Sequence, residues 1–81
     1  MKTRVLQIQG FGPVTVRGLS KREYLKIQRE AGGDLDVQVA LAIQQGVVQP
    51  KFTELAGLEG KDEEIDSIAN AIIDLTRPNV L

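Results

Sequence analysis

Two short segments near the amino terminus alternate between apolar and polar residues, and they constrain the fold most. In the segment KTRVLQIQ, Leu6 and Ile8 fall on one face of an extended chain. In VTVR, which follows shortly after, the two valines alternate with polar residues in the same way. The sequence GFGP between them is typical of a loop. The pattern predicts a β-hairpin over about residues 2–17 with a four-residue loop.

A helix is predicted directly after the hairpin, over about residues 21–31. Ser20 is a favourable N-cap, and Glu23 lies three residues further on, as in a capping box. The glycine pair GG that follows Ala31 favours the left-handed conformation that ends helices. The inner face of this helix carries Tyr24, Ile27 and Ala31, and its outer face carries Arg22, Glu23, Lys26, Arg29 and Glu30.

A second helix is predicted over about residues 34–45, with Asp34 as its N-cap. Its apolar residues occupy almost every direction around the axis, so it is either buried on most sides or offers a spare face to a partner. Burial between the hairpin and the last helix is the simpler alternative. The β-branched residues also fit a strand, but the length and the alanines favour a helix.

The segment GVVQPKF turns the chain after this helix. Gly46 is expected to end the helix, and Pro50 disfavours the helical conformation at Gln49. Val47 and Val48 are expected to be largely buried in the corner. A short helical turn is then predicted over about residues 53–58.

The last helix is predicted over about residues 61–76. Acidic residues crowd its first turn, where the helix dipole favours negative charge. Pro78 is expected to stop it and leave a short frayed tail. Its apolar stripe comprises Ile65, Ile68, Ala69, Ile72, Ile73 and Thr76. The predicted fold class is therefore α+β: an N-terminal β-hairpin packed on three main α-helices plus a short helical turn, in one domain over residues 1–81.

The composition argues against several classes of function. The chain has no cysteine and no histidine, which removes the commonest general base and the commonest metal ligands. The glycines of GFGPVTVRG lack the spacing of a phosphate-binding loop, and the acidic cluster Asp62, Glu63, Glu64 and Asp66 lacks the spacing of a calcium loop. We expect no catalytic, cofactor or metal site. No apolar run approaches the roughly 20 residues of a membrane span, so we expect a cytoplasmic protein.

Charge is distributed unevenly along the chain. Residues 1–30 carry seven basic and two acidic side chains, whereas residues 31–81 carry three basic and nine acidic ones. This asymmetry is typical of a nucleic-acid-binding end, of head-to-tail contacts between copies, or of two solvated faces that neutralise each other. A small DNA-binding regulator that uses the hairpin and the basic first helix is therefore the alternative function. The acidic residues within that helix and a pI near 5.3 weigh against it.

A surface for a protein partner is the preferred interpretation, with the uncharged run VQVALAIQQGVVQP at its centre. Phe11 at the hairpin loop either anchors a partner or folds back on the sheet. The residues expected to contact a partner are Phe11, Lys21, Arg22, Lys26, Arg29, Val37, Leu41, Val47 and Val48. A structural adaptor with an unidentified partner is a third option.

The order of these features resembles a known family. VTVRGLSKREYLKIQRE gives a strand, a Gly-Leu-Ser junction and a helix; GVVQPKFTEL and a closing helix that contains IIDL follow. Over about residues 14–76 this resembles the small tail assembly chaperones of long-tailed bacteriophages. The resemblance implies a non-enzymatic protein of the host cell cytoplasm that binds the tape measure protein and assists assembly of tail tube protein around it. Many such proteins also exist in a longer, frameshifted form. Separately, the uneven charge leaves a homo-oligomer open as a further expectation.

Overall fold

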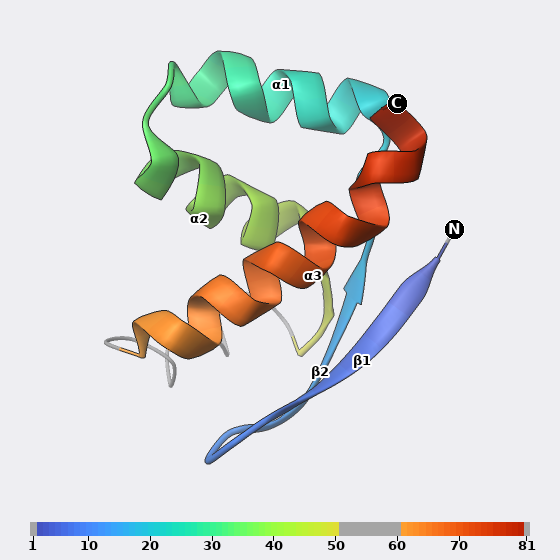
Figure 1. Cartoon of the computed structure of the whole chain (residues 1–81), viewed down its shortest axis with the longest axis vertical. Helices are drawn as coiled ribbons and strands as arrows, with labels where there is room; N and C mark the ends of the chain where they lie inside the picture. Colours follow the sequence, from blue (N-terminus) through green and yellow to red (C-terminus); the bar gives the residue numbers. More distant parts are fainter. Residues whose placement is uncertain (1, 51–60, 81) are drawn as a thin grey trace.

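The structure, a computed structural model, describes residues 2–50 and 61–80. Helix α3 is the central element, since it contacts β1, β2, α1 and α2 (Figure 1). The fold class is α+β as predicted, and the predicted turn over residues 53–58 lies outside the described residues. The elements in chain order are β1 (Thr3–Ile8), β2 (Gly12–Arg17), α1 (Lys21–Ala31), α2 (Leu35–Gly46), β3 (Val47–Gln49) and α3 (Asp62–Val80).

The predicted hairpin is present as β1 and β2, paired antiparallel from Thr3 opposite Arg17 to Ile8 opposite Gly12. Its loop is shorter than predicted, because β2 already begins at Gly12. Pro13 lies within β2, opposite Gln7 of β1. Proline has no backbone N–H, and this is tolerated because the pair is one of the non-hydrogen-bonded pairs of the antiparallel ladder.

The third strand, β3, was not predicted. It pairs antiparallel with β2, Val16 opposite Val47, and gives the sheet order β1-β2-β3. Val47 is half-buried, but Val48 is 47% exposed. The expectation that both valines are largely buried is therefore wrong for Val48. The register of β2 and β3 shifts here, since Val16 lies opposite Val47 but its neighbour Thr15 lies opposite Gln49. Val48 is therefore an extra residue without a partner in β2, as at a β-bulge.

Helix α1 agrees with its prediction. The Glu23 amide donates to the Ser20 hydroxyl at 3.1 Å, and the Ser20 amide donates to the Glu23 carboxylate at 2.9 Å. Gly32 closes the helix with a left-handed backbone, φ 58°, and its amide donates to the Gln28 carbonyl. The capping box and the glycine stop are local signals, which is why the sequence is sufficient to place both ends.

Helix α2 packs between α1 and α3 rather than between the hairpin and α3. Asp34 caps it as predicted and accepts hydrogen bonds from the amides of Asp36 and Val37. Gly46 is the last helical residue and lies against Ile72, where an added Cβ would come within 2.6 Å of that side chain. Glycine at this position therefore lets α2 and α3 approach closely without displacing the Ile72 side chain.

Helix α3 continues to Val80 with Pro78 inside it, so the predicted end at Thr76 is wrong. The last turns are tied to the junction between β2 and α1. The Leu19 amide donates to the Thr76 hydroxyl at 2.9 Å, and the Asn79 side-chain amide donates to the Leu19 carbonyl at 2.8 Å. These two hydrogen bonds join residues far apart in sequence. They compensate for the helical hydrogen bond that is lost because Pro78 has no backbone N–H.

Replacing Thr76 by valine is expected to lower the free energy of unfolding by about 2 kcal/mol. The hydroxyl is buried and also donates to the Ile72 carbonyl at 2.7 Å. Valine keeps the shape but leaves the buried Leu19 amide without its acceptor. Urea denaturation measures the change, and Thr15→Val, on the sheet face away from the helices, is the control expected to be near wild type. Equal stability of both variants would contradict the assigned role of the hydroxyl.

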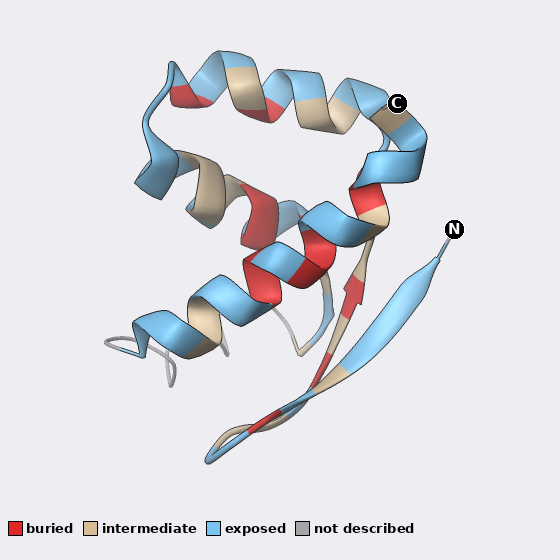
Figure 2. Ribbon diagram, viewed as in Figure 1, coloured by how far each residue is buried: buried red, intermediate tan, exposed pale blue. Residues whose placement is uncertain are grey.

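The core lies between the sheet and the helices, and its buried residues follow the inner side of each element (Figure 2). The largest fully buried side chains come from β2, the β2–α1 junction and α3: Val14, Val16, Leu19, Ile68, Ile72 and Thr76. The predicted stripe of α3 is buried except for Ile65, which is half-buried, and Ile73, which is 39% exposed. Ile73 points instead toward the groove described next.

Candidate functional site

An apolar groove lies where α1, α2 and α3 meet, and we call it the three-helix groove. Its volume is about 140 Å³, close to that of a cavity that holds a benzene-sized group. Its floor consists of the buried residues Leu19, Ile27, Ala42 and Thr76. The Thr76 hydroxyl is satisfied by its bonds to Leu19 and Ile72, so the floor presents apolar atoms to a ligand.

The rim of the groove carries large apolar side chains that remain accessible. Leu35, at the start of α2, is 72% exposed, and Ile73 of α3 is 39% exposed. Tyr24 of α1 and Val39 of α2 complete the rim and are half-buried. Apolar surface exposed around a concave apolar floor is the usual form of a site for an apolar ligand or a helix of a partner.

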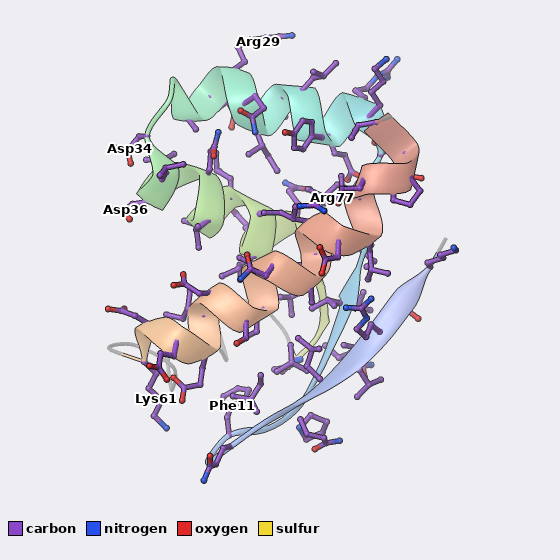
Figure 3. The ribbon with its side chains drawn as sticks, viewed as in Figure 1. Phe11, Arg29, Asp34, Asp36, Lys61 and Arg77 are labelled. Carbon is purple, nitrogen blue, oxygen red and sulfur yellow. The ribbon has the colours of Figure 1, made fainter. Side chains whose placement is uncertain are left out.

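Two glutamines connect the helices at the groove. Gln38 of α2 donates from its side-chain nitrogen to the side-chain oxygen of Gln28 on α1 at 2.6 Å. The bond joins α1 to α2. None of the described residues that line the groove is charged. In Figure 3, Asp34 and Asp36 point away from the other helices at the start of α2, and the side chain of Arg77 extends from α3 into the space between the helices in this view; none of the three lines the groove. The groove therefore favours uncharged, apolar side chains.

The predicted basic residues lie on the outer side of α1. Lys21, Arg22, Lys26 and Arg29 are all exposed, and Figure 3 shows Arg29 pointing away from the other helices. The Lys26 ammonium lies 4.0 Å from the Glu30 carboxylate. A second hollow, of about 450 Å³, lies between α1 and α2. It is lined by Arg22 and Lys26, by the carboxylates of α1, Glu23 and Glu30, and by Leu41 of α2. The basic surface is thus mixed in charge.

The remaining predicted partner residues do not form one surface. Phe11 is half-buried and packs against the core, so it folds back on the sheet. Val37 is exposed on the first part of α2, and Leu41 is half-buried against the core. Val48 is exposed in β3, an edge strand of the sheet. The uncharged run is therefore divided between the helices and the sheet.

The groove residues themselves were not proposed as a site from the sequence. Tyr24 and Ile73 were assigned to the inner faces of their helices, and Leu35 to the generally apolar second helix. A signal was available in the second helix, because a helix that is apolar in almost every direction can leave part of its apolar surface uncovered in a small domain. Only the packing of the helices shows which of them remain accessible.

Arg17 and Glu23 form a bidentate ion pair that joins β2 to α1. The two guanidinium nitrogens of Arg17 donate to the carboxylate oxygens of Glu23 at 3.0 and 2.7 Å. These hydrogen bonds, followed by the one from the Ser20 amide, lower the pKa of Glu23 to about 2, and the same bond raises the pKa of Arg17. Arg17 therefore holds the hairpin against α1.

Acidification is expected to remove the contribution of the Arg17–Glu23 ion pair to the free energy of unfolding. A lowered carboxyl pKa gives stability that is complete above the ordinary value of 4.5 and is lost as the pH falls toward about 2. The side chains are partly exposed, so we expect a loss of about 1 kcal/mol. Denaturation midpoints of the wild type and Glu23→Gln, measured from pH 7 to pH 2, should converge at the acid end. Glu30→Gln is the control, and a constant difference between wild type and Glu23→Gln would contradict the role of the ion pair.

Carboxylates at the start of α3 line shallower hollows. Asp62 and Asp66 face Asp36 across a hollow of about 630 Å³ between α2 and α3. Within residues 2–50 and 61–80, no group of three or more histidine, cysteine, aspartate or glutamate residues is placed to hold a metal ion. Over the same residues, none of the helices combines the length and the apolar character that a membrane span requires.

Comparison of the chain with protein-family models, with curated proteins and with solved structures gave no match. The geometry of the described residues and the family resemblance are therefore the two grounds for a functional proposal.

Proposed function

We propose that this chain is a non-enzymatic tail assembly chaperone that binds apolar side chains of the tape measure protein in the three-helix groove. The observation that carries the proposal is the accessible apolar rim of Leu35 and Ile73 around a buried apolar floor. A long helical client exposes apolar stripes of its own before assembly, and a groove between helices is a common way to cover such a stripe.

The resemblance over residues 14–76 supports the choice of client. It also implies that the tail tube protein is recruited at the same stage and that the protein acts in the host cell cytoplasm. The chemistry of the groove agrees with this choice, because an apolar, uncharged lining recognises the buried face of an amphipathic helix rather than a phosphate or a charged metabolite.

Co-expression tests the proposal. A tape measure protein expressed with this chain is expected to stay in the soluble fraction, and the same protein expressed alone is expected to aggregate. Expression with the variant Leu35→Asp/Ile73→Asp provides the matched control. No rescue by the wild type, or equal rescue by wild type and variant, would count against the groove as the client site.

DNA binding through α1 is tested in the same series. Lys21 and Arg29 are exposed, and a salt-sensitive gel shift that disappears in Lys21→Glu/Arg29→Glu would favour the regulator instead. We expect the wild type to give no shift at low salt, because acidic residues interrupt the basic surface.

A further inference from the structure

Strand β1 forms a free edge of the sheet. The strand order is β1-β2-β3, so β1 pairs on one side with β2 and, within the described residues, with no other strand. Figure 2 shows that β1 is exposed over most of its length. Val5, at its middle, is 57% exposed. Such an edge offers unpaired backbone groups to another strand.

The register shows which backbone groups point outward. The Gly18 amide donates to the Lys2 carbonyl, which makes that pair a hydrogen-bonded one. Bonded and non-bonded pairs alternate along an antiparallel ladder, and Pro13 opposite Gln7 agrees with a non-bonded pair. The backbone groups of Thr3, Val5 and Gln7 therefore point away from β2, toward the open edge.

We propose that β1 pairs antiparallel with β1 of a second copy of this chain, about a two-fold axis that passes through Val5. Val5 then bonds to Val5 of the second copy, and Thr3 bonds to Gln7 in both directions. The outward groups of all three residues are satisfied at once, and the two sheets become continuous. The contact is isologous, so it closes as a dimer.

Neighbouring registers satisfy the edge less well. A shift that centres the pair on Arg4 places Arg4 directly opposite its own copy, which is unfavourable for like charges. A shift that centres the pair on Leu6 leaves the outward groups of Thr3 without a partner in the opposite strand. The axis through Val5 is therefore the best register.

Charge complementarity selects a second copy as the occupant. In this register Arg4 of the second copy lies opposite Leu6, on the sheet face that α3 covers. A hollow of about 290 Å³ opens there, lined by Leu6 and Ile8 of β1 and by Glu63 and Glu64 of α3. The basic end of one strand thus meets the acidic start of α3 in the other copy.

The same arrangement uses the uneven charge of the sequence. Lys2 of the second copy lies opposite Ile8, which lines the same hollow, so two cations approach two carboxylates in each half of the dimer. An interface of one strand pair lies at the small end of specific contacts, and we expect a dimer that dissociates on dilution and weakens with salt.

Analytical ultracentrifugation over a range of concentrations tests the dimer. The wild type is expected to shift reversibly from 8.9 kDa to twice that mass. Val5→Pro removes an outward N–H without breaking a bond to β2, and it is expected to be monomeric; circular dichroism reports whether it is folded. A wild type that stays monomeric at all concentrations, or a folded Val5→Pro variant that dimerises like the wild type, overturns the proposal.

Charge reversal provides a second test that does not depend on the proline variant. Arg4→Glu is expected to raise the dimer dissociation constant about tenfold, and Arg4→Glu/Glu64→Arg is expected to restore it. Arg29→Glu, on the outer side of α1, is the control expected to leave the constant unchanged. No recovery in the double variant would contradict the predicted register. Leu35→Asp/Ile73→Asp is expected to dimerise normally, so failure of the dimer and failure of the groove are distinguishable.

Discussion

Replacing Gly18 by alanine is expected to lower the free energy of unfolding by about 3 kcal/mol, a large share of the roughly 4 to 12 kcal/mol expected for a domain of this size. A Cβ at this position would lie 2.8 Å from the Leu75 carbonyl carbon and would also collide with its oxygen. Both are backbone atoms of α3, which cannot rotate away as a side chain can. The contact lies beside Leu19, where Thr76 and Asn79 hold the same junction.

Gly46→Ala is the comparison for this prediction. Its Cβ would meet Ile72 at 2.6 Å, but all the atoms that it meets belong to a side chain, and displacing a buried side chain strains the fold less than displacing helix backbone. We expect a smaller loss, of about 1 kcal/mol, measured by urea denaturation followed by circular dichroism. A Gly18→Ala variant as stable as Gly46→Ala would contradict the close approach of α3 to the junction between β2 and α1.

Leu35→Asp/Ile73→Asp is expected to weaken binding of a tape measure segment by about 100-fold. In the proposed complex each residue covers apolar surface of the client, and burial of such a side chain contributes about 1.5 kcal/mol or more. The substitutions add charge to a lining that has none. Both side chains are accessible in the free protein, so the variant should remain folded.

Isothermal titration of the folded variants measures this loss. Leu25→Asp is the matched control, because Leu25 is 48% exposed on α1 but does not line the groove. Its affinity is expected to equal that of the wild type. A loss of binding in Leu25→Asp as large as in the double variant would mean that general surface hydrophobicity, and not the groove, holds the client.

The elements that the sequence predicts well have local causes. The hairpin follows from alternation within a few residues on each side of its loop, and α1 follows from Ser20, Glu23 and the glycine pair after Ala31. These signals act between neighbours in the chain. Their outcome therefore does not depend on how the rest of the protein packs.

The features that were predicted wrongly or missed depend on distant residues. Helix α3 passes Pro78 because Thr76 and Asn79 bind the backbone of Leu19. The strand β3 pairs with the edge of β2 that β1 leaves free, and the register shift between these two strands leaves Val48 unpaired and exposed. The groove likewise requires the relative placement of three helices, which no segment encodes alone.

The most direct test of the proposed function is nuclear magnetic resonance with the methyl groups of the full chain labelled. A synthetic amphipathic helix from a tape measure protein is titrated into the wild type. The methyl signals of Leu35, Val39 and Ile73 are expected to shift together and to saturate, while that of Val48 in β3, which does not line the groove, stays unchanged. Shifts confined to Val48 and other residues outside the groove, or no shift at all, would contradict the groove as the client site.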